Sequence, residues 1–212
     1  MLKEQPDLIL FGGDLIDSRT PHDPAFAAEV SRVLASMQAP FGQFAVAGNH
    51  DNRLIAEYRY MKSLLEDGGF ILLDNQAVIV DDLLIGGLAE SYFGRPELDK
   101  AFSLEGLLTA SQETPDDLSG FFRLLLMHQP DYAAALPAGS ADLAFSGHSH
   151  NGQITFFGKP IITVYEGSRF PYGLYRLNDA HTLIVSRGLG TVGIPARLGA
   201  RPELVVVTVR RS

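Results

Sequence analysis

Residues 6–17 read PDLILFGGDLID, and this stretch indicates which kind of fold the chain adopts. The apolar run at residues 8–11 lies between Pro6 and Gly12, as expected for a buried strand of a parallel sheet. Asp14 follows that run almost at once. In open α/β sheets, ligands bind outside the carboxyl ends of the strands. The stretch therefore predicts a carboxylate at a position where such folds bind their ligands.

Helix and strand patterns alternate after this first strand. Apolar residues recur at helical spacing over residues 24–37, and Asp23 is a candidate cap for the start of that helix. A second buried strand at residues 44–47 precedes a second helix at residues 53–66. This alternation predicts an α/β unit with a parallel sheet.

Short strands dominate the rest of the chain. Those at residues 70–73, 77–80 and 83–87 are joined by Asp-Asn and Asp-Asp turns, which suggests antiparallel meanders. A polar segment at residues 91–120 interrupts them and is expected to include one helix near residues 98–108. Further strands are expected at residues 124–127, 143–145, 154–157, 161–164, 183–185 and 204–209. The patterns together predict two β-sheets packed against each other with helices outside.

Composition and charge exclude several classes of protein. The chain has 212 residues, of which 46% are hydrophobic and 20% charged, so we expect one globular domain over residues 1–212. A net charge of -8 argues against a nucleic-acid surface, although bound cations can still attract an anionic substrate. The absence of cysteine excludes disulfides and thiolate ligands. No apolar run has the length of a transmembrane helix, and the first residues do not form a signal peptide.

Candidate metal ligands follow the predicted buried strands. They are the carboxylate of Asp14, the amide oxygen of Asn49 and the imidazoles of His128, His148 and His150. Imidazole ligands suit Mn, Fe, Zn or Ni better than Mg or Ca. In an extended segment, His148 and His150 point the same way, which lets them address two metals about 3.5–4 Å apart.

Each of these blocks alone has a simpler explanation. Gly13-Asp14 is compatible with an ordinary strand-to-helix turn, Asn49-His50 with a turn that has a capping Asn, and His128 with a core histidine. Four independent turns would seldom give this set of ligands in this order. The combination therefore favours a metal site.

These motifs resemble those of the calcineurin-like metallophosphoesterases, and in particular the bacterial YkuE/YaeI-like branch of envelope-associated phosphodiesterases. The stretches that carry the resemblance are residues 6–17, 47–51, 126–131, 142–153, 185–190 and 197–203. The resemblance implies a four-layer α/β/β/α sandwich of two mixed sheets, with a dinuclear metal site at one sheet edge.

The resemblance also implies a role for each candidate residue. Asp14 would bridge two divalent cations, Asn49, His128 and His148 would complete the site of one, and His150 would bind the other. His50 would hydrogen-bond the substrate phosphate or the leaving oxygen, as an acid or charge stabiliser. Asp17 and Asp51 would orient the ligands. The implied reaction is in-line attack on phosphorus by a metal-activated hydroxide.

The chain departs from the family in two places. The family's Asp-x-His block, which ends a first strand and binds the same metal as His150, has no counterpart before Asp14. We therefore expect the domain to be N-terminally incomplete and to lack its first strand. The Asp-x-His at residues 179–181 is expected beside a hairpin turn and not as a replacement. Asn151 stands where the branch has Gly, a modest change because Asn tolerates left-handed backbone.

The sequence leaves two functions open. One is a metal-dependent phosphodiesterase or pyrophosphatase that acts on a phosphoester small molecule, an envelope lipid or a cell-wall precursor. The other is a catalytically impaired fragment, or a non-catalytic module that binds a single cation. Residues 91–96 are expected to form a surface loop, although they could also line the entry to the site. A cytoplasmic location fits the chain itself, and membrane or envelope association would depend on residues upstream of Met1.

Overall fold

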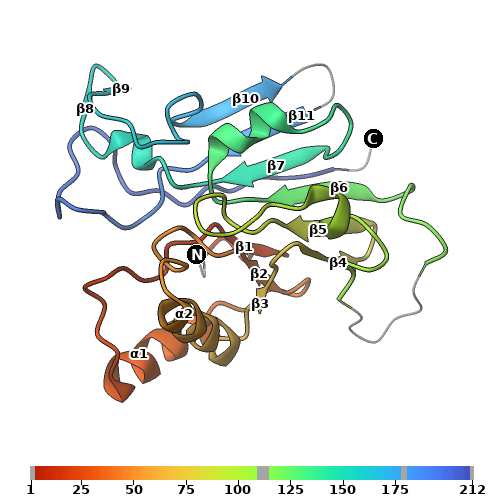
Figure 1. Cartoon of the computed structure of the whole chain (residues 1–212), viewed down its shortest axis with the longest axis horizontal. Coiled ribbons are helices and arrows are strands. Elements are labelled where there is room, and N and C mark those ends of the chain that lie inside the picture. Colours follow the sequence, from red (N-terminus) through yellow and green to blue (C-terminus); the bar gives the residue numbers. More distant parts are fainter. Residues whose placement is uncertain (1–2, 109–114, 178–180, 211–212) are drawn as a thin grey trace.

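The computed structural model describes residues 3–108, 115–177 and 181–210 and shows two β-sheets packed face to face between helical layers (Figure 1). The smaller sheet contains β1 (Ile9–Phe11), β2 (Gln43–Ala45) and β3 (Ile71–Leu72), all parallel. The larger sheet is mixed, in the order β10-β11-β7-β6-β5-β4. Its strands are β4 (Gln76–Val80), β5 (Leu83–Gly87), β6 (Phe122–Leu126), β7 (Leu143–Ser146), β10 (Gly173–Leu177) and β11 (His181–Val185). A separate hairpin is formed by β8 (Thr155–Phe156) and β9 (Lys159–Pro160).

Helices cover the outer face of each sheet. The smaller sheet is covered by α1 (Pro24–Ala35) and α2 (Ile55–Asp67), and the larger sheet by α3 (Leu98–Ala101) and the 3₁₀ helix η1 (Pro130–Ala135). A short turn, η2 (His150–Gly152), lies next to the hairpin. The α/β/β/α arrangement expected from the sequence is confirmed.

Four apolar clusters fill the spaces between the four layers. Successive residues of one strand serve different clusters, because side chains alternate between the two faces of a sheet. Phe44 packs between the sheets, whereas Ala45 packs under α1 and α2. Likewise Leu124 packs between the sheets, whereas Leu125 faces η1. The alternation explains why each buried strand is apolar on both faces.

Four of the predicted elements are wrong in whole or in part. The strand at residues 70–73 becomes β3, which pairs with β2 in the smaller sheet and not within a meander. The helix predicted over residues 98–108 ends at Ala101, because the chain turns back at Gly106 to place Leu107 beside β4. Residues 161–164 and 204–209 form no strand in the described structure. The hairpin turn predicted at residues 178–179 lies outside the described residues.

Across residues 3–108, 115–177 and 181–210, no helix combines the length and hydrophobicity that crossing a bilayer requires.

Candidate metal centre

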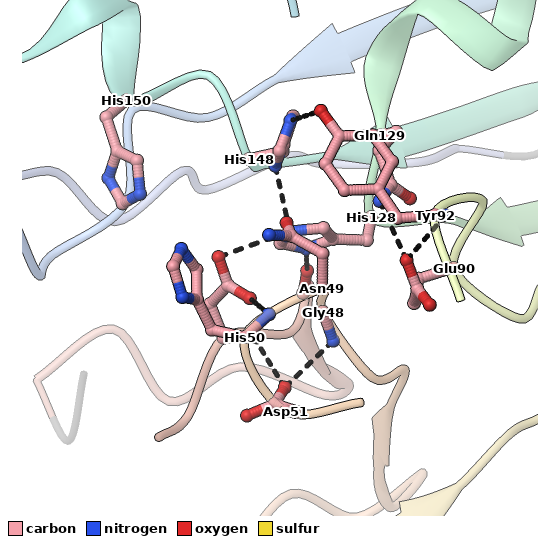
Figure 2. Close-up of polar contacts among 12 residues, drawn as sticks. Gly48, Asn49, His50, Asp51, Glu90, Tyr92, His128, Gln129, His148 and His150 are labelled. Atoms are coloured by element: carbon pink, nitrogen blue, oxygen red, sulfur yellow. Dashed lines mark hydrogen bonds and ion pairs between the residues drawn. The ribbon is translucent and has the colours of Figure 1, made fainter. Parts of the chain in front are cut away.

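The candidate ligands meet where four strands end. Asp14 and Asn49 follow β1 and β2 of the smaller sheet, and His128 and His148 follow β6 and β7 of the larger one. Figure 2 shows the side chains of Asn49, His128 and His148 converging from the two sheets. The site therefore lies between the sheets, at their shared carboxyl edge.

Three of these residues form a group with the dimensions of a metal site. The ligand atoms of Asp14, His128 and His148 all lie within 4.8 Å of one another. His128 Nε2 is 3.3 Å from Asp14 Oδ2, 3.2 Å from Asn49 Oδ1 and 3.2 Å from His148 Nδ1. One imidazole nitrogen is thus surrounded by a carboxylate, an amide oxygen and a second imidazole nitrogen.

Backbone carbonyls on the outside fix the orientation of both rings. His128 Nδ1 lies 2.6 Å from Gly12 O, and His148 Nε2 lies 2.8 Å from Tyr165 O. Because a carbonyl oxygen can only accept, each of these ring nitrogens carries the hydrogen. In its neutral form, each ring then has a lone pair on the nitrogen that faces inward, which is Nε2 in His128 and Nδ1 in His148. Two lone pairs beside a carboxylate are the arrangement that a cation satisfies.

The electrostatics of the cluster are dominated by one coupled pair. Burial would raise the pKa of Asp14, but the adjacent His128 outweighs it and holds that pKa well below its usual range. Burial would lower the pKa of His128, but Asp14 raises it above its ordinary value. Burial, helped by the charge on His128, lowers the pKa of His148 to about 4. His148 is therefore neutral near pH 7, which is the form that binds a metal ion.

A buried carboxylate holds the loop that carries Asp14. Asp51 accepts hydrogen bonds from the backbone N–H groups of Asp14 at 2.7 Å, Ile16 at 3.0 Å and Gly48 at 2.8 Å. Burial, together with the charge on Asp14, raises the pKa of Asp51 to about 7. A Cβ on Gly48 would lie 2.1 Å from Asp14 Oδ1, so only glycine permits this approach. Asp51 has the orienting position expected of it.

Asp17 does not share that position. Its carboxylate accepts hydrogen bonds from the side chain and backbone N–H of Arg19 in an exposed turn. The structure thus separates Asp17 from the ligands, contrary to the expectation that it would orient them.

His50 lies beside the cluster and is partly exposed (Figure 2). Its backbone N–H donates to Asp14 Oδ1 at 3.0 Å. This bond fixes the main chain of His50 against Asp14, the residue expected to bridge two cations. The ring is thereby left near the cluster with a route to solvent, as an acid or charge stabiliser requires.

His150 is set apart from the three-residue group (Figure 2). Its Nδ1 lies 3.0 Å from Arg197 Nη2. Since a guanidinium can only donate, Nδ1 accepts this bond and Nε2 carries the hydrogen. Burial and the charge on Arg197 lower the pKa of His150 to about 4. The role of His150 as a ligand of a second cation stays a prediction.

The remaining histidines lie elsewhere, as expected. His22 is exposed and its ring stacks on Tyr60 with centroids 4.2 Å apart. His181 is buried, with Nε2 2.7 Å from Pro137 O. Its location beside β7 excludes it as a substitute ligand in this arrangement, and Asp179 lies outside the described residues.

The loop at residues 91–96, which the sequence predicted as a surface loop or as the lining of an entry, completes the surroundings of His148. The buried carboxylate of Glu90 accepts hydrogen bonds from the N–H groups of Tyr92, Phe93 and Gly94, each at 2.8 Å. The loop places Tyr92 Oη 3.2 Å from His148 Nε2. Residues 91–96 are thus more than a surface loop, because Tyr92 contacts a candidate ligand. No local sequence pattern predicts the contact between Tyr92 and His148.

Comparisons with known proteins agree with the geometry of the site. The sequence model of the calcineurin-like phosphoesterase family matches residues 1–152. The chain belongs to this family. It is 34% identical to the uncharacterized metallophosphoesterase YkuE of Bacillus subtilis, over 99% of this chain and 70% of that protein. It is 30% identical to the phosphodiesterase YaeI of Escherichia coli, over 97% of this chain and 71% of that protein.

These likenesses confirm the branch of the family that the motifs predicted. The chain is a metal-dependent phosphoesterase, and hence a hydrolase of phosphoric esters. Its family uses metal ions, and the group formed by Asp14, His128 and His148 is a candidate place for one.

Proposed function

We propose that this metallophosphoesterase hydrolyses a phosphodiester or pyrophosphate bond at a dinuclear centre. The observation that carries the proposal is the convergence of one carboxylate and two inward-facing imidazole nitrogens from two different sheets. We assign Asp14, Asn49, His128 and His148 to one divalent cation, with Asp14 as the bridge to a second that His150 would bind. The donor set favours Mn, Fe, Zn or Ni over Mg or Ca.

The second cation requires a change at His150. In the structure, Nδ1 accepts from Arg197 and Nε2 carries the hydrogen. A ring nitrogen must be free of hydrogen to bind a metal, so His150 would exchange its contact with Arg197 on loading. At the first site, Asp14 raises the pKa of His128, so His128 Nε2 would release its proton when the cation binds.

The chain's own residues account for most of the arrangement that catalysis needs. Bound divalent cations would lower the pKa of water and neutralise charge on the phosphate oxygens. Asp51 holds the backbone of Asp14, and the carbonyls of Gly12 and Tyr165 hold the two rings. His50, with its main chain bonded to Asp14, would donate to the phosphate or to the leaving oxygen.

The substrate is a phosphoester, and its finer identity is part of the proposal. The likeness to a protein named phosphodiesterase supports a diester. We propose a phosphodiester or pyrophosphate of an envelope lipid or a cell-wall precursor, handled by residues 1–212 as one domain.

Metal analysis combined with hydrolysis tests this function. We expect the protein loaded with Mn to hold two ions per chain and to hydrolyse bis-p-nitrophenyl phosphate. Replacing His148 by Ala removes an inward-facing ligand, so metal affinity and turnover should each fall at least about a hundredfold, the upper range for loss of a supporting partner. His22→Ala is the matched control, because His22 is exposed and stacks on Tyr60. Equal metal content and turnover in His148→Ala and His22→Ala would sink the assignment.

A second candidate function follows from the separation of His150 from the other ligands. In that case the chain is a module that binds a single cation without catalysis. One metal ion per chain, with no hydrolysis of the diester, would support the module over the enzyme.

A further inference from the structure

We propose that the β8–β9 hairpin docks onto an anionic lipid bilayer. The docking surface, called the hairpin patch below, consists of apolar side chains whose exposed fractions lie between 62% and 92%. They are Phe156, Phe157, Ile161, Ile162 and Leu198.

Contacts between two distant segments make the hairpin patch continuous. The rings of Phe156 and Phe157 lie 4.5 Å apart. Ile161 donates its N–H to Ile154 O at 3.1 Å, and Thr155 donates to Leu198 O at 2.8 Å. The first bond joins Ile161, just after the hairpin, to Ile154, just before it. The second bond joins the hairpin to the segment around Leu198. Contiguous exposed apolar surface of this kind marks an interaction site.

The shape of the hairpin favours insertion over the filling of a groove. Gly158 has a φ of +77° at the tip, and the turn leaves Phe157 92% exposed. Figure 1 shows β8 and β9 at the outer end of the molecule, well away from α1 and α2. A projecting tip with two aromatic rings can reach the apolar part of a membrane interface.

Charge decides which kind of partner the hairpin patch fits. Residues 150–212 contain eight Lys or Arg and three Asp or Glu, whereas the whole chain contains 17 and 25. Lys159 lies in β9 itself, and Arg201 is exposed shortly after Leu198. Apolar side chains accompanied by Lys and Arg, on a molecule that is otherwise acidic, complement an anionic membrane surface. A second copy that met this one through the same patch would instead place Lys and Arg against Lys and Arg.

The hairpin patch begins next to the candidate metal centre. His150 lies in η2, a few residues before β8, and contacts Arg197, the neighbour of Leu198. Gln153 Nε2 donates to Val192 O at 2.8 Å and ties the same two segments together. A docked hairpin would therefore turn this side of the centre toward lipid headgroups, a consequence that rests on the proposed function. The docking itself does not depend on the proposed function.

Fluorescence offers a direct test, because the chain contains no tryptophan. Phe157→Trp places a single reporter in the hairpin patch, and Phe41→Trp places the control at a 40% exposed position between α1 and β2. With vesicles of phosphatidylcholine and phosphatidylglycerol, we expect a blue shift and quenching by brominated lipid for Phe157→Trp alone. Sedimentation with the same vesicles should show the Phe156→Ser/Phe157→Ser variant bound about tenfold more weakly. Lys159→Glu should weaken binding roughly fivefold on these vesicles and leave binding to pure phosphatidylcholine unchanged.

The opposite results overturn the proposal. One is a Phe157→Trp emission spectrum that vesicles do not shift, and another is a Phe156→Ser/Phe157→Ser variant that sediments with vesicles as well as the parent does. A third is a parent protein that is a dimer in analytical ultracentrifugation while the double Ser variant is a monomer. Far-UV circular dichroism of that variant should match the parent, because both rings are exposed. Binding is measured without substrate and in the presence of EDTA, so failure of docking and failure of hydrolysis are separate outcomes.

Discussion

A single buried carboxylate, Asp51, determines where the carboxylate of Asp14 lies. It accepts three backbone N–H groups of the loops that follow β1 and β2. An Asn at this position presents an NH₂ group to donors that need an acceptor. We expect Asp51→Asn to weaken Mn binding by about 10–100-fold, as loss of a partner that orients a ligand does. Isothermal titration calorimetry measures the change. Asp17→Asn, which alters the contacts with Arg19 and Thr20 away from the ligands, should bind like the parent, and equal weakening of both would contradict this role.

Glycine at position 48 is required by the approach of Asp14. A Cβ there would lie 2.1 Å from Asp14 Oδ1 and 2.5 Å from Asp14 N. We expect Gly48→Ala to displace Asp14 and to reduce metal affinity by at least about tenfold. Gly120→Ala is the matched control, because nothing lies within 4 Å of its added Cβ. If Gly48→Ala kept its bound metal through dialysis as well as Gly120→Ala does, the close approach would not matter.

Among individual residues, the sequence predicted those that follow strands. It missed those whose partners are distant in the sequence. Asp14, Asn49, His128 and His148 are recognisable because each comes within three residues of the end of an apolar run. Arg197 has no such position, and Glu90, although it follows the apolar residues 83–89, was not singled out. Their partners, Gln129 and His150, lie 39 and 47 residues away in the chain. Only the completed fold brings these pairs together.

Among the elements, α1 owes its start to one side chain. Asp23 Oδ1 accepts the N–H groups of Ala25 at 3.0 Å and Phe26 at 2.9 Å. Replacing Asp23 by Ala leaves these groups without that acceptor, so the free energy of unfolding should fall by about 0.5–2 kcal/mol. Urea denaturation followed by circular dichroism gives the value. Glu29→Ala, in the exposed middle of the same helix, should change the free energy of unfolding far less, and an equal loss would argue against the cap.

Helices were predicted more accurately than strands for a physical reason. The start of α1 depends on local hydrogen bonds between Asp23 and its neighbours, which the sequence displays. A strand needs a partner across a ladder, which the sequence does not display. Residues 204–209 are apolar and β-branched, yet no ladder forms along them in the described structure. The helix predicted up to residue 108 is wrong for a similar reason, because a distant partner decides the structure. Leu108 donates its N–H to Ala77 O at 2.8 Å and not within a helix.

At the scale of the whole molecule, two sheets pack against each other. The only candidate metal-binding group in the described structure takes its residues from both sheets. Asp14 follows a strand of the smaller sheet, and His128 and His148 follow strands of the larger one. Apolar packing around Phe44 and Leu124 joins the same two layers. A bound cation would thus add a second connection between the sheets at the edge where the loops meet.

This connection predicts that metal stabilises the entire fold and not only the site. At a free metal concentration about 100 times the Kd, binding adds about 2.7 kcal/mol to the free energy of unfolding. For a chain of this size, that corresponds to a rise in Tm of about 5–10 °C. Differential scanning calorimetry with Mn and with EDTA measures it. The difference should vanish in His148→Ala and persist in His22→Ala, since only the former removes a ligand. If His148→Ala kept the full difference, the stabilising ion would have to bind elsewhere, and the two sheets would be held together by their apolar packing alone.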